Sequence, residues 1–378
     1  MSARRTWSQR RRQRYTPPQV SENRPRRPYP NGWFAVGFSA DVPPGSLRRS
    51  RFMDEDIVVY RTRAGALRVV RPYCPHLGAH LGYGGTVEGE NIVCPFHRFA
   101  YDPNGVCVQT GYGTRPPKAK LTNLPVREVN GAVLVWHHAR GEGPQWEIRD
   151  IDMTGFPKPM THTYTIIDHP QEIVENAVDI GHIGPIHHYR NVRVRNPFAV
   201  DGTRFTIGPA AERIFPMLGA VDVLFDVEAH GLGYISVTAN IPRLRAAALF
   251  QAMSTPIDPC RVDLRFSVSI RLGAAGRPSS QTALFVSRLL TVALSGAFWR
   301  DLSLDFPIWE NKAYLPRPRL AKGDGPIMPF RRWASQFYEQ SELVGGARAP
   351  LSDGRESRPS NGSYAAPRTA QEASGQSH

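Results

Sequence analysis

The sequence "CPHLGAH" at residues 74–80 and the sequence "CPFH" at residues 94–97 share one arrangement. Each stretch opens with a cysteine followed by proline, and each carries a histidine two or three positions after that cysteine. Cysteine thiolates and histidine imidazoles are common ligands of transition metals in proteins, so the two stretches predict a metal site. The candidate ligands are Cys74, His76, Cys94 and His97.

The pairing of residue types distinguishes between possible metals. A tetrahedral zinc site groups cysteines with cysteines and histidines with histidines at short spacings. Here each stretch supplies one cysteine and one histidine. A binuclear cluster fits this pattern, because one iron can take both cysteines and the other both histidines. The motif therefore predicts a Rieske [2Fe–2S] cluster, in which neutral imidazoles raise the reduction potential.

The sequence around the two stretches is typical of a small β domain. From Trp33 to about Val135, short segments rich in β-branched and aromatic residues, such as "WFAVGFS" and "AVLVWHH", alternate with Gly, Pro, Asn and Asp turns. Both metal-binding stretches fall between such segments. We expect an antiparallel β domain over residues 31–140 that carries the cluster in two loops. Cys107, a third thiol in this region, is expected to be a small buried hydrophobic residue.

Positive charge is concentrated at the N-terminus. The formal net charge is +14, and residues 1–28 hold nine arginines and one glutamate. No aromatic-rich or helical recognition pattern accompanies these arginines, so residues 1–30 are expected to form a disordered arm rather than a nucleic-acid-binding or membrane-binding element. The Ser-, Gly- and Pro-rich residues 345–378 are expected to be a disordered tail. Four cysteines in 378 residues do not form a disulfide scaffold and indicate a reducing compartment.

The most apolar stretch, "TALFVSRLLTVALSGAFW" at residues 282–299, is interrupted by Arg288. A confident transmembrane prediction needs about 18 uncharged residues in a row, so no transmembrane span is expected. A buried or amphipathic helix explains the stretch better, and a helix that touches a membrane is the alternative.

A second histidine motif lies in "ENAVDIGHIGPIHHY", residues 175–189. Its spacing is Asp179, then His182, then His187. An ideal helix would point these histidines in different directions, but Pro185 must bend or end the helix and can let both imidazoles converge. His188 competes with His187 on spacing alone. Two histidines and a carboxylate form the facial triad of non-haem Fe(II) oxygenases, which leaves positions open for O2.

With both motifs present, the chain resembles the Rieske non-haem iron oxygenases over roughly residues 32–340. The segment "SLDFPIWENKAYLPRPRLAKGDGPIMPFRRWASQFY", residues 303–338, closely resembles the C-terminal region of the 3-ketosteroid 9α-hydroxylase oxygenase component and of the cholesterol 7-desaturases. The resemblance implies mononuclear iron bound by His182, His187 and a downstream aspartate. Asp305 matches that aspartate, and Asp301 is the alternative.

The resemblance also implies an architecture. We expect an α+β protein, with the N-terminal Rieske domain followed by a helix-grip catalytic domain over residues 141–344. In this family Asp179 is not a ligand but connects a cluster histidine of one subunit to an iron-ligand histidine of the next, in a ring-shaped homotrimer. One departure is Phe99, where the family usually has tryptophan after the second cluster histidine.

The expected function is that of a terminal oxygenase. It would use O2 and electrons from a separate ferredoxin or NAD(P)H-dependent reductase, because the chain shows no G-x-G-x-x-G dinucleotide motif. It would hydroxylate or desaturate a bulky apolar, steroid-like substrate in the cytoplasm. The alternatives are an oxygenase of aromatic compounds or arylamines in secondary metabolism and a Rieske electron carrier without a second iron. A zinc-dependent nucleic-acid-binding protein is more remote, since it conflicts with the pairing of ligands.

Overall fold

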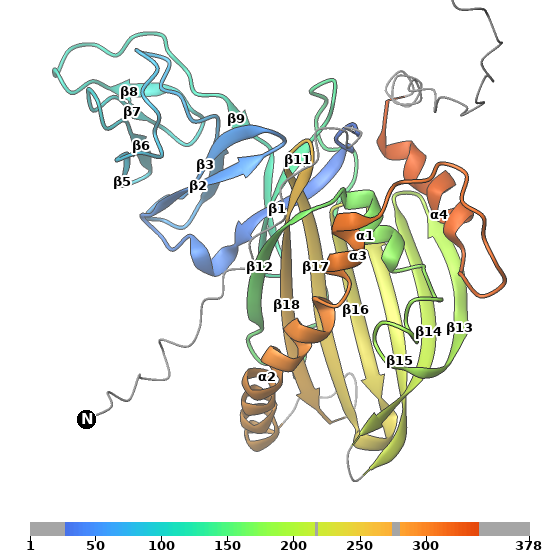
Figure 1. The fold of residues 1–378 in the computed structure, drawn as a ribbon. Helices are drawn as coiled ribbons and strands as arrows, with labels where there is room; N and C mark the ends of the chain where they lie inside the picture. Colours follow the sequence, from blue (N-terminus) through green and yellow to red (C-terminus); the bar gives the residue numbers. More distant parts are fainter. Residues whose placement is uncertain (1–26, 216–217, 274–279, 340–378) are drawn as a thin grey trace, which may run out of the picture.

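The described part of the chain, residues 27–215, 218–273 and 280–339 of the computed structural model, forms two β-rich units. Figure 1 shows the smaller N-terminal unit beside a second unit built on one large sheet. Most of the predicted arm and tail lies outside the described residues, so their disorder stays a prediction. Arg27, near the end of the predicted arm, pairs with Glu172 (2.9 Å) and lies over the ring of Tyr314.

Three small antiparallel sheets form the N-terminal unit. Strand β1 is buried along its whole length, because its sequence "GWFAVGF" has no charged residue to place on an outer face. The short strands β5–β8 form the sheet next to the two predicted cluster loops. In sheet order the strands are β1 (Gly32–Phe38), β11 (Ala132–His137) and β10 (Val126–Val129); β2 (Leu47–Phe52), β3 (Glu55–Arg61), β4 (Leu67–Val70) and β9 (Asn123–Leu124); β5 (Thr86–Glu88), β6 (Asn91–Val93), β7 (Ala100–Tyr101) and β8 (Cys107–Gln109).

A seven-stranded antiparallel sheet forms the second unit. The two units share a core, and the carbonyl of Ala35 in β1 accepts hydrogen bonds from Thr255 (2.6 Å) and Arg265 (2.7 Å) of the large sheet. The order of the strands is β12 (Met160–Ile167), β18 (Arg261–Leu272), β17 (Ala246–Asp258), β16 (Tyr234–Ile241), β15 (Gly219–His230), β14 (Arg204–Phe215) and β13 (Arg190–Asp201).

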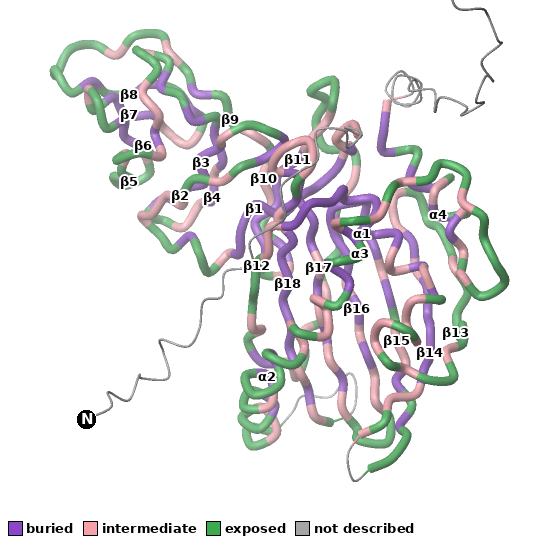
Figure 2. The backbone as a smooth tube through the Cα atoms, in the orientation of Figure 1, coloured by how far each residue is buried: buried purple, intermediate pink, exposed green. Residues whose placement is uncertain are grey.

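Helices α1 (Pro170–Asn176), α3 (Phe306–Asn311) and α4 (Ile327–Ala334) lie over one face of this sheet (Figure 1). Buried residues run along the strands beneath them (Figure 2). Val174 of α1, Phe205 of β14 and Trp333 of α4 belong to one hydrophobic core. The expected α+β architecture, an antiparallel β domain followed by a domain of one large sheet with helices over it, is confirmed.

Helix α2 (Gln281–Leu302) forms where the apolar stretch predicted a helix. Its burial differs from the expectation, because its buried residues are Ser287, Thr291 and Ser295 rather than its leucines. The segment Gln281–Asn311, which includes α2, also has the length and composition of a membrane-crossing helix. Only 17% of its most apolar window is buried inside the protein. The polar side chains of α2 instead tie it to the sheet.

Candidate metal centres

The two predicted cluster loops have the same backbone conformation. In each loop the cysteine N–H donates to the carbonyl five residues later, at 2.8 Å for Cys74 and 2.9 Å for Cys94. The N–H four residues after each cysteine donates back to the cysteine carbonyl. Gly78 (φ 76°) and Arg98 (φ 55°) both adopt the left-handed conformation that this turn requires. The fold therefore presents the two Cys–His pairs as matched halves of one site.

The side chains of these loops suit a metal cluster. Cys74 and Cys94 are both 2% exposed, and the rings of His76 and His97 lie 4.9 Å apart at the partly exposed rim. The buried Nδ1 of His97 has no hydrogen-bond partner among the described residues. Burial raises the pKa of the Cys94 thiol and the neighbouring Cys74 thiol raises it further, so both sulfurs can be thiolates together only if a cation offsets their charge. Their arrangement fits a [2Fe–2S] cluster.

Phe99 takes the position at which the family usually has tryptophan. It is 3% exposed, and its ring stacks on the His76 ring with centroids 4.2 Å apart. The aromatic contact with a cluster histidine is thus kept without an indole. The rim is also unusually apolar, because several large side chains around it are exposed. They are Tyr73, Leu77, Tyr83, Phe96 and Tyr112.

The second histidine motif lies in a chain of turns after α1. The sequence predicted helical composition as far as Gly184, but α1 ends at Asn176. Beyond the helix, the N–H of Ile180 donates to the carbonyl of Asp324 (3.1 Å) in the loop before α4, which holds the following turns. The turns, rather than a kinked helix, bring His182 and His187 together.

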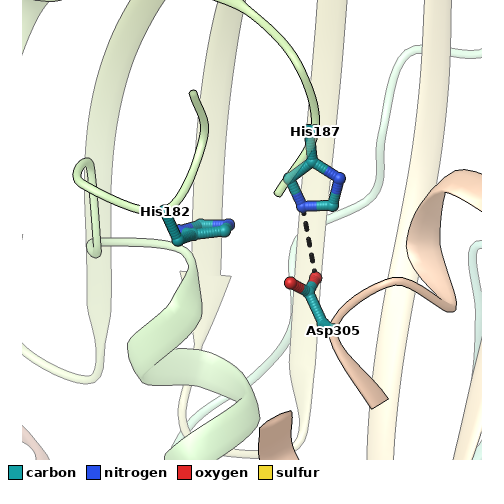
Figure 3. A group of neighbouring side chains, drawn as sticks. All are labelled: His182, His187 and Asp305. Atoms are coloured by element: carbon teal, nitrogen blue, oxygen red, sulfur yellow. Dashed lines mark ion pairs between the residues drawn. The ribbon is translucent and has the colours of Figure 1, made fainter. Parts of the chain in front are cut away.

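Three ligand atoms converge at this point, one each from His182, His187 and Asp305, all within 4.8 Å of one another (Figure 3). Asp305 lies directly before α3 and is 4% exposed, and its carboxylate does not cap that helix. His187 Nε2 lies 3.3 Å from Asp305 Oδ2. His188 is exposed and is absent from this group. Two imidazoles and one carboxylate, close together and mostly buried, match the donor set of a facial triad.

Asp301, the alternative to Asp305, lies behind His187. Its Oδ2 is 3.6 Å from His187 Nδ1, and its carboxylate accepts two hydrogen bonds from Arg213 of β14, at 3.1 and 3.4 Å. The Arg213 guanidinium also lies over the ring of Tyr189. The 3.6 Å distance from Asp301 to His187 Nδ1 is too long for a hydrogen bond, and the buried Nδ1 of His187 has no hydrogen-bond partner among the described residues, so Asp301 acts on the ring through its charge.

The two histidines of the group have opposite electrostatic environments. Burial lowers the pKa of His182, which favours the neutral imidazole that a metal requires. Burial also opposes charge on His187, but the hydrogen bond and negative charge of Asp305, together with Asp301, raise its pKa overall. A metal cation between His187 and Asp305 would take the place of the proton that the raised pKa keeps on His187.

Asn176, which the sequence did not single out, contacts two members of the group. Its side-chain amide lies 3.1 Å from His182 Nε2 and 3.3 Å from Asp305 Oδ2. Asn176 is the last residue of α1 and lies three residues before Asp179. This short spacing from the histidine motif was the one sequence signal that could have pointed to it. Arg213 was also missed, because its partner Asp301 is 88 residues away in the sequence.

Asp179 lies at the protein surface next to this group. Its backbone carbonyl accepts from His182 Nδ1 (2.5 Å), while its carboxylate is 38% exposed and accepts from the His182 N–H (3.3 Å). A hollow of about 650 Å³ opens beside it, lined by Gly181, Val194, Lys322 and Gly323 among others. The predicted cluster loops lie at the far end of the N-terminal unit from α1 and α3 (Figure 1).

Comparison with known proteins identifies both the N-terminal unit and the unit built on the large sheet. Residues 32–125 match the Rieske [2Fe-2S] domain, and residues 135–338 match the 3-Ketosteroid 9alpha-hydroxylase C-terminal domain. The chain belongs to the Rieske oxygenases of the 3-ketosteroid 9α-hydroxylase family. The enzyme is therefore an oxidoreductase with an iron–sulfur domain, and its resemblance to that family is confirmed.

Its relatives and structural neighbours are oxygenases and desaturases. This Rieske oxygenase is 30% identical to a cholesterol 7-desaturase of Ciona intestinalis, over 83% of this chain and 69% of that protein. It is 29% identical to the "Probable 3-ketosteroid-9-alpha-monooxygenase, oxygenase component" of Rhodococcus rhodochrous, over 84% and 82%. The structure of dicamba monooxygenase bound to dicamba has the same fold, with a TM-score of 0.64 at 16% identity, over 84% of this chain and 98% of that one.

Proposed function

We propose that this Rieske oxygenase is the terminal component of a multicomponent system that hydroxylates or desaturates a bulky apolar, steroid-like substrate. The observation that carries the proposal is the convergence of His182, His187 and Asp305 in a chain that also has a Rieske domain. An electron carrier alone needs no second group of metal ligands. The family comparisons support the steroid class, since the relatives act on cholesterol or 3-ketosteroids by name.

In this proposal His182, His187 and Asp305 hold one Fe(II), while Cys74, His76, Cys94 and His97 hold the [2Fe–2S] cluster. The bound iron supplies the activation of O2. The protein's own part is to keep the site dry and oriented. Asn176 can hydrogen-bond the Asp305 carboxylate (3.3 Å), and the negative charge of Asp301 lies 3.6 Å behind His187 Nδ1. The low exposure of Asp305, 4%, limits competition from water.

We further propose that the enzyme is a homotrimer in which Asp179 connects neighbouring copies. Within one chain the cluster loops and the His182 group lie far apart (Figure 1). The exposed Asp179 carboxylate can accept a hydrogen bond from a cluster histidine of another copy while it holds His182. The hollow beside Asp179 offers space for the apolar rim of the partner's cluster loops.

Electrons would come from a separate ferredoxin or NAD(P)H-dependent reductase, in a reducing, cytoplasmic compartment that keeps Cys74 and Cys94 as thiols before cluster assembly. The substrate would lie on the sheet face near α2. The ring of Phe225 packs edge-on against that of Tyr189, two residues after His187. The rings of Phe250 and Phe298 of α2 have their centroids 5.1 Å apart. These partly buried aromatic side chains suit an apolar polycyclic substrate.

The test is turnover of a panel of 3-ketosteroids, sterols and substituted aromatic compounds with a surrogate ferredoxin and reductase, followed by mass spectrometry. The proposal predicts a product that differs by one oxygen atom or by the loss of two hydrogens, from steroids or sterols only. Turnover of aromatic compounds alone would favour an oxygenase of aromatic compounds or arylamines. Reduction of the cluster without any product, in protein that lacks a third iron, would indicate an electron carrier.

A further inference from the structure

Helix α2 buries a polar face and exposes an apolar face, which is the reverse of an ordinary surface helix. Surface helices of globular proteins place apolar residues against the core and polar residues in water. In α2 the buried residues are Ser287, Thr291 and Ser295. Large apolar side chains point outward instead, with Phe285 62%, Leu289 54% and Val292 54% exposed. The exposed colour of α2 in Figure 2 reflects this arrangement.

The polar face is turned inward because the sheet has an open edge there. Strand β12 pairs with β18 only as far as Val268. Beyond that point the N–H of Ile270 donates to Thr291 Oγ1 (2.9 Å), and the N–H of Leu272 donates to Ser287 Oγ (3.0 Å). Unpaired backbone groups at a buried edge are costly, so these bonds fix which face of α2 meets the sheet. The apolar face is left outward as a consequence.

A basic rim lies at the end of the sheet where β18 ends. The N–H of Gly273, at the end of β18, donates to the carbonyl of Arg245 (2.7 Å) in the turn between β16 and β17. Arg243, in the same turn, donates to the carbonyl of Leu218 (3.0 Å) between β14 and β15. Leu218 and Leu244 are exposed here. The rim thus places two arginines and two exposed leucines at one end of the sheet, beside the start of α2.

From Gln281 to Arg300 the charges of α2 are positive, and the one acidic residue of the helix, Asp301, is paired with Arg213. Residues 281–300 contain Arg288 and Arg300 and no aspartate or glutamate. A contiguous apolar face with cationic residues beside it is complementary to an anionic lipid surface, where acyl chains accept the apolar side chains and headgroups attract the arginines. The chain's own termini are poor candidates to cover it, because residues 1–26 are dominated by arginine and residues 340–378 by Ser, Gly, Pro and Arg.

We propose that α2 and the neighbouring basic rim dock this enzyme on the surface of an anionic lipid bilayer. The helix lies in the plane of the headgroups rather than spanning the membrane, since spanning would break its hydrogen bonds to β18. Docking itself does not depend on the substrate. The far end of α2 leads to Asp305, so docking also brings the candidate iron site close to the lipid; that consequence rests on the proposed function.

The experiment is sedimentation of the iron-loaded full-length enzyme with phosphatidylcholine vesicles, with and without about 30% phosphatidylglycerol. The proposal predicts binding to the anionic vesicles. The double variant Phe285→Gln/Leu289→Gln should lower the partition coefficient at least about tenfold, because two apolar anchors are lost. Arg288→Glu should lower it at least about fivefold on anionic vesicles only. The control Leu315→Gln/Leu320→Gln, which changes two exposed leucines away from α2, should leave binding unchanged.

A tryptophan introduced as Leu289→Trp gives an independent readout. Lipids brominated on their acyl chains should quench its added fluorescence if α2 enters the bilayer. Wild-type enzyme that binds no vesicles would overturn the proposal. Binding that the α2 double variant retains would also overturn it and assign the interaction to the arginine-rich residues 1–26. A change of oligomeric state in that variant, measured by light scattering, would overturn it in favour of a contact between copies.

Discussion

Asp301 and Asp305 lie four residues apart, yet the fold gives them different partners. Asp305 faces His182 and His187, whereas Asp301 is held by Arg213 behind His187. Sequence spacing alone allowed either to be the third iron ligand. The difference arises because α2 ends at Leu302, so Asp305 belongs to the turn before α3 while Asp301 remains on α2.

Asp301→Asn tests the supporting role of this carboxylate. The amide keeps the size of the side chain but removes the charge that faces His187 and Arg213. We expect the affinity of the second site for Co(II), titrated anaerobically, to fall about 10- to 100-fold, with the cluster spectrum unchanged. Asp222→Asn, at an exposed Asp–Arg pair on β15, is the matched control. An affinity within twofold of wild type would show that Asp301 does not support the ligand.

The predicted metal ligands that spacing alone suggested lie close together in the sequence, whereas Asp305 was assigned from the family resemblance. The Cys–His pairs and the two histidines of the second motif lie within a few residues of each other, so loop geometry alone brings each pair together. Asn176 and Arg213 were missed because their contacts depend on packing. Their partners Asp305 and Asp301 are 129 and 88 residues away. No pattern of spacing encodes such contacts.

At the scale of elements, the loop before α4 supports the turns that carry His182. Gly325 (φ 91°) lies so close to the carbonyl of Val178 that an added Cβ would be 2.2 Å from that oxygen. Gly325→Ala should therefore displace the turns and reduce the iron content of the second site more than that of the cluster. Gly323→Ala, at a residue with positive φ but no atom near its Cβ, is the matched control for backbone strain alone. Equal iron loss in both variants would contradict the steric argument.

The β14–β15 pair carries a pH-dependent contribution to stability. A hydrogen bond from His230 lowers the pKa of Glu228 to about 2 against the effect of burial, and Arg204 lowers it further. Because this pKa is below the ordinary value of 4.5, the contribution is present above about pH 4.5 and is lost as the pH falls toward 2. Glu228→Gln should cost about 1–2 kcal/mol near pH 7 and almost nothing near pH 2. The measurement is the melting temperature of wild type and Glu228→Gln from pH 2 to pH 7. A difference between the two proteins that does not change with pH would contradict the contribution of the Glu228–His230 pair.

The strands were more predictable than the helices. Strands β15, β16 and β18 carry apolar residues at alternating positions, which is typical of strands. The end of α1 and the orientation of α2 were not predictable. Both depend on hydrogen bonds to distant backbone groups, at Asp324 for the turns after α1 and at Ile270 and Leu272 for α2. The apolar stretch alone predicted a helix but not which of its faces meets the sheet.

For the whole molecule, the distance between the cluster loops and the second site within one chain motivates a complementation test. Cys94→Ser should lack the cluster, and Asp305→Ala should lack the second iron, so each should be inactive alone. When the two are produced together, mixed trimers should recover part of the wild-type turnover, because the cluster of one copy serves the iron of another. Co-purification with different tags isolates the mixed species. Mixed trimers without any activity would contradict transfer between copies.

The central claim is that one chain holds a Rieske cluster and a separate mononuclear iron at His182, His187 and Asp305. The most direct measurement is iron content together with electron paramagnetic resonance of the reduced protein, for wild type and Asp305→Ala. The account predicts three irons per chain in the wild type and two in the variant, with the same Rieske signal in both. Equal iron content in the two proteins, or a colourless protein loaded with zinc, would contradict it.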